Sequence, residues 1–128
     1  MTHTNTRTMT IQQIADRLVE LCRRQQTTQA YQELFSEEAA SHEMPGVPDG
    51  NIQGLDNLIA KSEAYDEGMT IHSITVTDPL VYEQYFTVGM GIDVTPKDGQ
   101  RHQEHEICVY QVRDGKIVDE RFVYAMGE

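Results

Sequence analysis

Apolar residues in the first part of the chain recur at steps of three and four. Between residues 10 and 24 this stripe consists of Ile11, Ile14, Ala15, Leu18, Leu21 and Cys22. The period predicts an amphipathic helix, and Thr10 with Gln13 has the spacing of a capping box at its start. Thr27 and Thr28 can cap a second, shorter helix. A third helix is expected after Gly54, with one face made of Leu55, Leu58, Ile59, Ser62 and Tyr65.

The apolar period falls to two in the second half of the chain. The clearest alternation is that of Phe86, Val88, Met90, Ile92 and Val94. We expect strands over residues 69–77, 85–95, 100–112 and 116–124, with turns at residues 96–99 and at Asp114-Gly115. A short extended piece is expected over residues 39–44. Helices followed by an antiparallel meander predict an α+β fold with the helices on one face of the sheet.

The strand over residues 100–112 is apolar on both faces near its end. Cys108 and Tyr110 lie on one face, and Ile107 and Val109 lie on the other. Because the helices of one chain can cover only one face of this sheet, we expect a homodimer to cover the second face.

Charge and composition exclude several classes of function. The 128 residues carry a net charge of -11, and binding of nucleic acid or of anionic membranes depends on clustered Lys and Arg. We therefore expect neither partner. The Thr-rich start has no apolar run, so we expect a flexible tail over residues 1–9, a single domain over residues 10–128 and a cytoplasmic location. The two cysteines, Cys22 and Cys108, are expected to be buried thiols.

The five histidines do not have the spacing of a metal site. His102, Glu104 and Glu106 share one strand face, but no zinc or facial-triad pattern is present. No phosphate loop or dinucleotide fingerprint appears either. We expect neither a metal nor a cofactor.

The order of elements and two strand motifs resemble a known family. Gly54-Leu55-Asp56 opens the third helix, and the motifs are Met90 to Val94 and Glu106 to Val118. Together they resemble the SnoaL-like branch of the nuclear transport factor 2-like superfamily. The resemblance implies three helices packed on a curved sheet around a cone-shaped pocket, usually in a dimer. Its members include isomerases, cyclases, dehydratases and non-enzymes, so it specifies fold more than function.

The same resemblance implies that Glu43 is a general base. The segment from Phe35 to Glu43 is similar to the segment of ketosteroid isomerases that carries their catalytic carboxylate. A poorly solvated carboxylate at the mouth of an apolar pocket can accept a proton, and His42 is expected to orient it or relay protons. The alternative is a solvated glutamate that leads into a loop.

The remaining positions implied by the resemblance are less typical of those enzymes. The two oxyanion-hole positions hold Leu18 and Cys108, and the last-strand positions used by polyketide cyclases hold Arg121 and Phe122. Neither Leu18 nor Cys108 is a good hydrogen-bond donor for a developing oxyanion.

Other residues are expected to contact a ligand. If Cys108 faces the pocket, alternation sends Glu106 and Tyr110 the same way. The alternatives are a core role for Tyr110 and an ion pair between Glu106 and Arg121. Phe86 and Met90 are expected to line the pocket or to fill it.

Two functional hypotheses remain open from sequence. One is a pocket that binds a small, mostly apolar molecule and catalyses cofactor-free proton transfer. The other is a non-catalytic dimeric module for binding or interaction.

Overall fold

The computed structural model describes residues 8–125, and the predicted helices and strands appear in the expected order, with two short strands in addition. The helices are α1 (Ile11–Arg23), α2 (Thr27–Leu34) and α3 (Leu55–Gly68). The strands are β1 (Phe35–His42), β2 (Asn51–Gln53), β3 (Met69–Val76), β4 (Leu80–Tyr82), β5 (Tyr85–Pro96), β6 (His102–Arg113) and β7 (Lys116–Val123). β1 starts directly after α2, earlier than the extended piece expected over residues 39–44. Most of the expected tail lies outside the described residues.

The strands form one sheet in the order β2-β1-β7-β6-β5-β3, with β4 paired to β5. The meander from β3 to β7 is antiparallel, as predicted. β1 pairs with β7 in parallel, which the sequence did not indicate. This pairing brings residues near position 40 beside residues near position 120.

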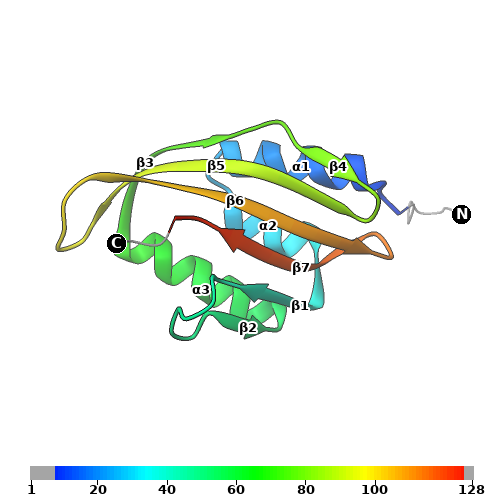
Figure 1. Ribbon diagram of the computed structural model, residues 1–128, viewed down its shortest axis with the longest axis horizontal. Coiled ribbons are helices and arrows are strands. Elements are labelled where there is room, and N and C mark those ends of the chain that lie inside the picture. Colours follow the sequence, from blue (N-terminus) through cyan, green and yellow to red (C-terminus); the bar gives the residue numbers. More distant parts are fainter. Residues whose placement is uncertain (1–7, 126–128) are drawn as a thin grey trace, which may run out of the picture.

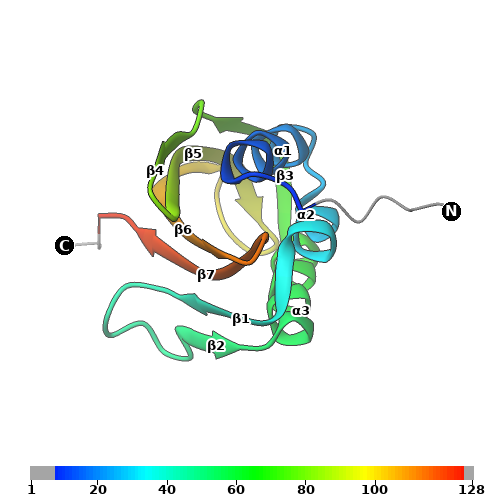
Figure 2. The same cartoon turned by 90° about the vertical axis from the view of Figure 1, so that its right-hand side faces the viewer.

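The sheet is strongly curved, and the helices close its open side (Figures 1 and 2). Register shifts occur in the β1–β7, β3–β5 and β6–β7 pairings. Such irregularities bend strands and increase their twist. The result is the α+β cone that the sequence predicted.

The predicted apolar face of α1 forms much of the core. From α1 the buried residues are Ile14, Ala15, Leu18, Val19, Leu21 and Cys22. They pack with Leu58 of α3 and with Phe86, Val88 and Tyr110 of the sheet. Cys22 and Cys108 are free buried thiols, as expected.

Two local devices begin the helices. The capping box of α1 is present. The backbone N–H of Gln13 donates to Thr10 Oγ1 at 3.1 Å, and the backbone N–H of Thr10 donates to Gln13 Oε1 at 2.9 Å. α3 begins after Gly54, whose φ of 99° is one that side-chain-bearing residues rarely adopt. None of the helices within residues 8–125 combines the length and the apolar composition that a membrane crossing requires.

Candidate functional site

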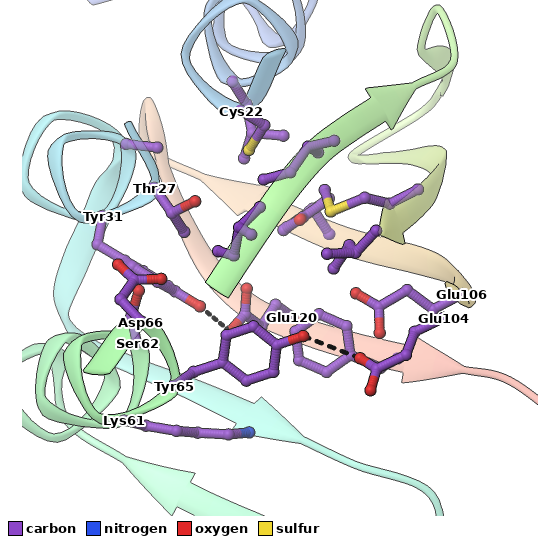
Figure 3. Close-up of a pocket in the computed structure, with 18 of the residues that line it drawn as sticks. Cys22, Thr27, Tyr31, Lys61, Ser62, Tyr65, Asp66, Glu104, Glu106 and Glu120 are labelled. Atoms are coloured by element: carbon purple, nitrogen blue, oxygen red, sulfur yellow. Dashed lines mark hydrogen bonds between the residues drawn. The ribbon is translucent and has the colours of Figure 1, made fainter. Parts of the chain in front are cut away.

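A partly open cavity of about 180 Å³ lies between the concave face of the sheet and the helices (Figure 3). Its walls are mostly apolar. The lining residues with polar or aromatic groups are Thr27, Tyr31, Phe35, Glu43, Lys61, Ser62, Tyr65, Asp66, Glu104, Glu106, Tyr110, Glu120 and Phe122.

Local periodicity explains most of this lining. On β6, alternation sends Glu104, Glu106 and Tyr110 to the concave face. Tyr110 is paired with Glu120 of β7, which faces the same side. On α3, Lys61 and Tyr65 are four residues apart and share one helix face.

Glu120 is the most enclosed carboxyl of the cavity, with 2% of its surface exposed. Its Oε2 atom accepts hydrogen bonds from the Tyr31 hydroxyl at 2.7 Å and from the Ser41 hydroxyl at 2.8 Å. Burial raises the pKa of Glu120 to about 7, although both hydroxyl donors act in the opposite direction. The carboxyl can therefore gain or lose a proton near neutral pH.

Glu106 is a second carboxyl of this kind on the neighbouring strand. Its contact within the described residues is a long hydrogen bond of 3.5 Å from the Cys108 thiol to Oε2. Burial raises the pKa of Glu106 to about 7, and the negative charges of Glu43 and Glu104 add to the effect. The sequence-based alternative of an ion pair with Arg121 is wrong, because Arg121 bonds to Asp119 at 3.0 Å.

Glu43 also lines the cavity, and both of its oxygens have partners. Lys61 Nζ lies 2.5 Å from Oε2, and the Tyr124 hydroxyl donates to Oε1 at 2.8 Å. The neighbouring His42 points elsewhere: its ring nitrogens contact Asn51 at 2.7 Å and Asp119 at 2.9 Å. His42 is not part of the cavity lining, so it is not placed to orient Glu43.

Glu104 sits between two partners. It accepts a hydrogen bond from the Tyr65 hydroxyl at 2.9 Å and contacts His102 at 2.9 Å. Burial and this carboxylate raise the pKa of the Tyr65 phenol, so the phenol remains a donor at neutral pH.

The ligand residues expected from sequence are only partly brought together. Leu18, Met90, Glu106 and Tyr110 line the cavity, whereas Cys108 and Phe86 lie behind it in the core. Tyr110 faces the cavity and is also a core aromatic, because its ring stacks on Phe86 with centroids 4.8 Å apart. Whether any of these residues contacts a ligand stays a prediction.

The sequence reasoning missed Glu120, Tyr31 and Ser41. Alternation from Phe122 would have found Glu120, since the two residues share one face of the last strand. No local signal pairs Glu120 with Tyr31 or Ser41, which are 89 and 79 residues away in the chain.

The arrangement suits acid–base chemistry more than nucleophilic or metal chemistry. The burial of Cys22 raises the pKa of its thiol to about 12, so it stays protonated. Among residues 8–125, no three His, Cys, Asp or Glu side chains converge as metal ligands do. The absence of a metal or cofactor in the working protein stays a prediction.

These features define a class of protein: an α+β cone of the nuclear transport factor 2-like fold, with ionisable carboxyls in a mostly apolar cavity. A family model of the SnoaL-like domain matches residues 9–124. The chain belongs to this SnoaL-like family.

Solved structures agree with this assignment. One is a candidate SnoaL-like polyketide cyclase from Mesorhizobium loti, also described as a carbohydrate phosphatase. It is 33% identical with a TM-score of 0.86, and the match covers 91% of this chain and 100% of that one. A candidate isomerase from Bacillus subtilis is 21% identical with a TM-score of 0.67, over 88% of this chain and 84% of that one.

A third structure shows the same fold at low identity. It is a Catenulispora acidiphila protein with a ketosteroid isomerase-like fold, in complex with trimethylamine. It is 11% identical with a TM-score of 0.71, over 88% of this chain and 85% of that one. The comparison with curated proteins gives no match.

Proposed function

We propose that the cavity binds a small, mostly apolar molecule and catalyses cofactor-free proton transfer on it, of the isomerase or cyclase type. The observation that carries this proposal is the presence of Glu106 and Glu120 inside a mostly apolar cavity, each with a pKa of about 7. General acid–base catalysis is most efficient when the pKa of the group lies near the working pH.

Glu106 is the proton acceptor that the contacts favour. Both oxygens of Glu43 are engaged by Lys61 and Tyr124, and Glu120 accepts two short hydrogen bonds. Within residues 8–125, Glu106 has only the weak thiol contact. Proton transfer requires a base within hydrogen-bond reach of the substrate, and a carboxylate without strong partners meets that requirement at least cost.

The same wall offers donors for a developing negative charge. The usual oxyanion positions hold Leu18 and Cys108, which are poor donors. Tyr110 faces the same cavity as Glu106, four residues further along β6. Burial keeps the pKa of Tyr110 well above the ordinary value, so its hydroxyl remains protonated. We assign Tyr110 as the polar anchor for a substrate oxygen.

A direct test is exchange of substrate hydrogen for deuterium. Small cyclic ketones that bind the protein would be incubated with it in D₂O, and loss of the α-hydrogen signal would be followed by NMR. We expect exchange above the buffer rate, and we expect Glu106→Gln to slow it by about 100-fold or more. Glu38→Gln removes an exposed carboxyl of β1 and is the matched control.

Three outcomes distinguish the alternatives. Loss of exchange in Glu43→Gln but not in Glu106→Gln would show that Glu43 is the general base, as the sequence suggested. Equal rates in all variants would remove the acid–base role of both carboxyls. Binding without exchange for every ketone would support the non-catalytic binding module, which the poor donors at Leu18 and Cys108 favour.

A further inference from the structure

The cavity carries more negative than positive groups. Among residues 8–125, the carboxyls that line it are Glu43, Asp66, Glu104, Glu106 and Glu120, and the one basic side chain is Lys61. Lys61 is already paired with Glu43, and Glu104 is held by Tyr65 and His102. Glu106 and Glu120 form no ion pair with any residue in the described range 8–125, although buried carboxylates usually persist with a countercharge.

Glu120 also has unused hydrogen-bonding capacity. Tyr31 and Ser41 both donate to Oε2, while Oε1 accepts no hydrogen bond from residues 8–125. An ionised carboxylate has acceptor sites on both oxygens. The side chain is buried and lines the cavity, so a ligand in the cavity is the available partner for Oε1.

The walls around these carboxyls are aromatic. Tyr31, Phe35, Tyr65, Tyr110 and Phe122 line the cavity (Figure 3 labels Tyr31 and Tyr65). Ring faces attract cations, and one such contact exists already, with Lys61 Nζ 5.5 Å from the centroid of Phe122. Carboxylates and aromatic faces together are the surroundings that an organic ammonium group requires.

We propose that the cavity recognises a small organic cation, an ammonium group on a compact apolar frame, with Glu120 as its main countercharge and Glu106 of β6 as a second carboxyl of the same cavity. This inference rests on the proposed ligand-binding role of the cavity and adds the charge of the ligand. The volume of about 180 Å³ is close to the ~150 Å³ cavity that holds one benzene molecule. Benzylammonium is therefore a suitable probe.

The affinity for such a cation depends on pH through both carboxyls. The ionised forms bind the cation, and each carboxyl has a pKa of about 7 in the empty cavity. Below pH 7 each carboxyl must lose its proton before the cation binds. The affinity for the cation therefore falls by up to about tenfold for each pH unit of acidification and for each carboxyl. The other titratable or charged groups that line the cavity are Cys22 of α1, Tyr31 of α2, Lys61, Tyr65 and Asp66 of α3, Glu43, and Glu104 and Tyr110 of β6.

The experiment is isothermal titration calorimetry with three probes of similar shape: benzylammonium, benzyl alcohol and benzoate. At about pH 8 we expect benzylammonium to bind at least tenfold more tightly than benzyl alcohol, and benzoate to bind most weakly. The preference for benzylammonium should shrink at about pH 6. Glu120→Gln should abolish most of it, because glutamine keeps an acceptor for Tyr31 and Ser41 but removes the charge.

Control variants make the result specific. Glu106→Gln is a second test that leaves the Tyr31 and Ser41 contacts intact, and Glu38→Gln is the control outside the cavity. A preference that survives both cavity variants and disappears at high salt would reflect the overall charge of -11 and would overturn the inference.

Two further outcomes separate this inference from the proposed function. Equal binding of benzyl alcohol and benzylammonium would overturn the cationic ligand and leave a neutral substrate in the same cavity. Failure of all three probes to bind, while ketones exchange hydrogen in D₂O, would overturn the proposal of a cationic ligand and leave the proposal of proton-transfer catalysis standing. Failure of both experiments would overturn both proposals.

Discussion

Glu120 shows how burial and hydrogen bonding compete at a single carboxyl. Removing the group from water favours the neutral acid, while the Tyr31 and Ser41 hydroxyls favour the anion. Burial wins, and the pKa rises to about 7. The exposed Glu33 shows the opposite balance, since Arg17 lowers its pKa to about 2. Similar side chains thus differ in charge at neutral pH because of their surroundings.

The raised pKa values of Glu106 and Glu120 predict a dependence of stability on pH. In the folded state both carboxyls keep protons that the unfolded chain releases near the ordinary glutamate pKa of 4.5. The stability they contribute is complete below that value and is lost as pH rises through about 7. We expect the free energy of unfolding to fall between about pH 5 and about pH 8.

Glu120→Gln should reduce this fall by an amount on the order of 2 kcal/mol. Urea unfolding followed by circular dichroism at several pH values measures it, with Glu38→Gln as the control. Glu33 does not interfere, because the stability linked to its lowered pKa changes only between about pH 2 and its ordinary range. An unchanged pH profile in Glu120→Gln would show that this carboxyl does not titrate in the window.

At the scale of elements, two strands and one helix supply most of the polar groups that line the cavity. β6 and β7 present alternate residues to the cavity, and α3 presents residues one turn apart. The parallel pairing of β1 with β7 adds Ser41 next to Glu120, with which it shares a register position. In each element, the spacing that places apolar residues on the inner face also places these polar residues there.

The capping box of α1 predicts a measurable contribution to stability. Thr10→Ala removes the hydroxyl that accepts from the Gln13 amide, and loss of an N-cap of this kind costs about 1 kcal/mol. Thermal or urea unfolding measures the change. Thr70→Ala, at an exposed threonine of β3, is the matched control and should change stability by less than about 0.5 kcal/mol. Equal effects of the two substitutions would contradict the role of the cap.

At the scale of the whole molecule, curvature creates the cavity. The bent sheet leaves a space that the helices close on one side (Figure 2), and the polar groups of the site point into that space. Among residues 8–125, apolar side chains of the convex face stay exposed: Ile107 is 51% and Val123 46% exposed, and the two are paired across β6 and β7.

The homodimer expected from sequence stays a prediction at this scale. If the convex face is its interface, the mass from light scattering at tens of micromolar should be twice the 14.6 kDa of the chain. Ile107→Lys should then lower the mass to that of the monomer, because it places a charge in an apolar interface. Glu38→Gln should leave the mass unchanged. A monomeric mass of the unaltered chain would remove the dimer.

The sequence by itself determined the three helices, the four long strands of the meander and which strand residues share a face, but not the short strands β2 and β4. Periods of 3.6 and 2 are local properties, so Thr10, Leu18 and Leu58 were predictable, and so was the common face of Glu106, Cys108 and Tyr110. Family resemblance determined the fold, because it depends on the order of elements. It also led to Glu43, which does line the cavity, and to His42, which does not.

Only the tertiary structure decided which polar groups meet. Tyr31 and Ser41 reach Glu120 across 89 and 79 residues, and Lys61 and Tyr124 reach Glu43 across 18 and 81 residues. These contacts depend on strand register, on the parallel β1–β7 pair and on the placement of α3. Because burial sets the pKa of a carboxyl, the chemistry of Glu106 and Glu120 emerged only when the chain had enclosed them.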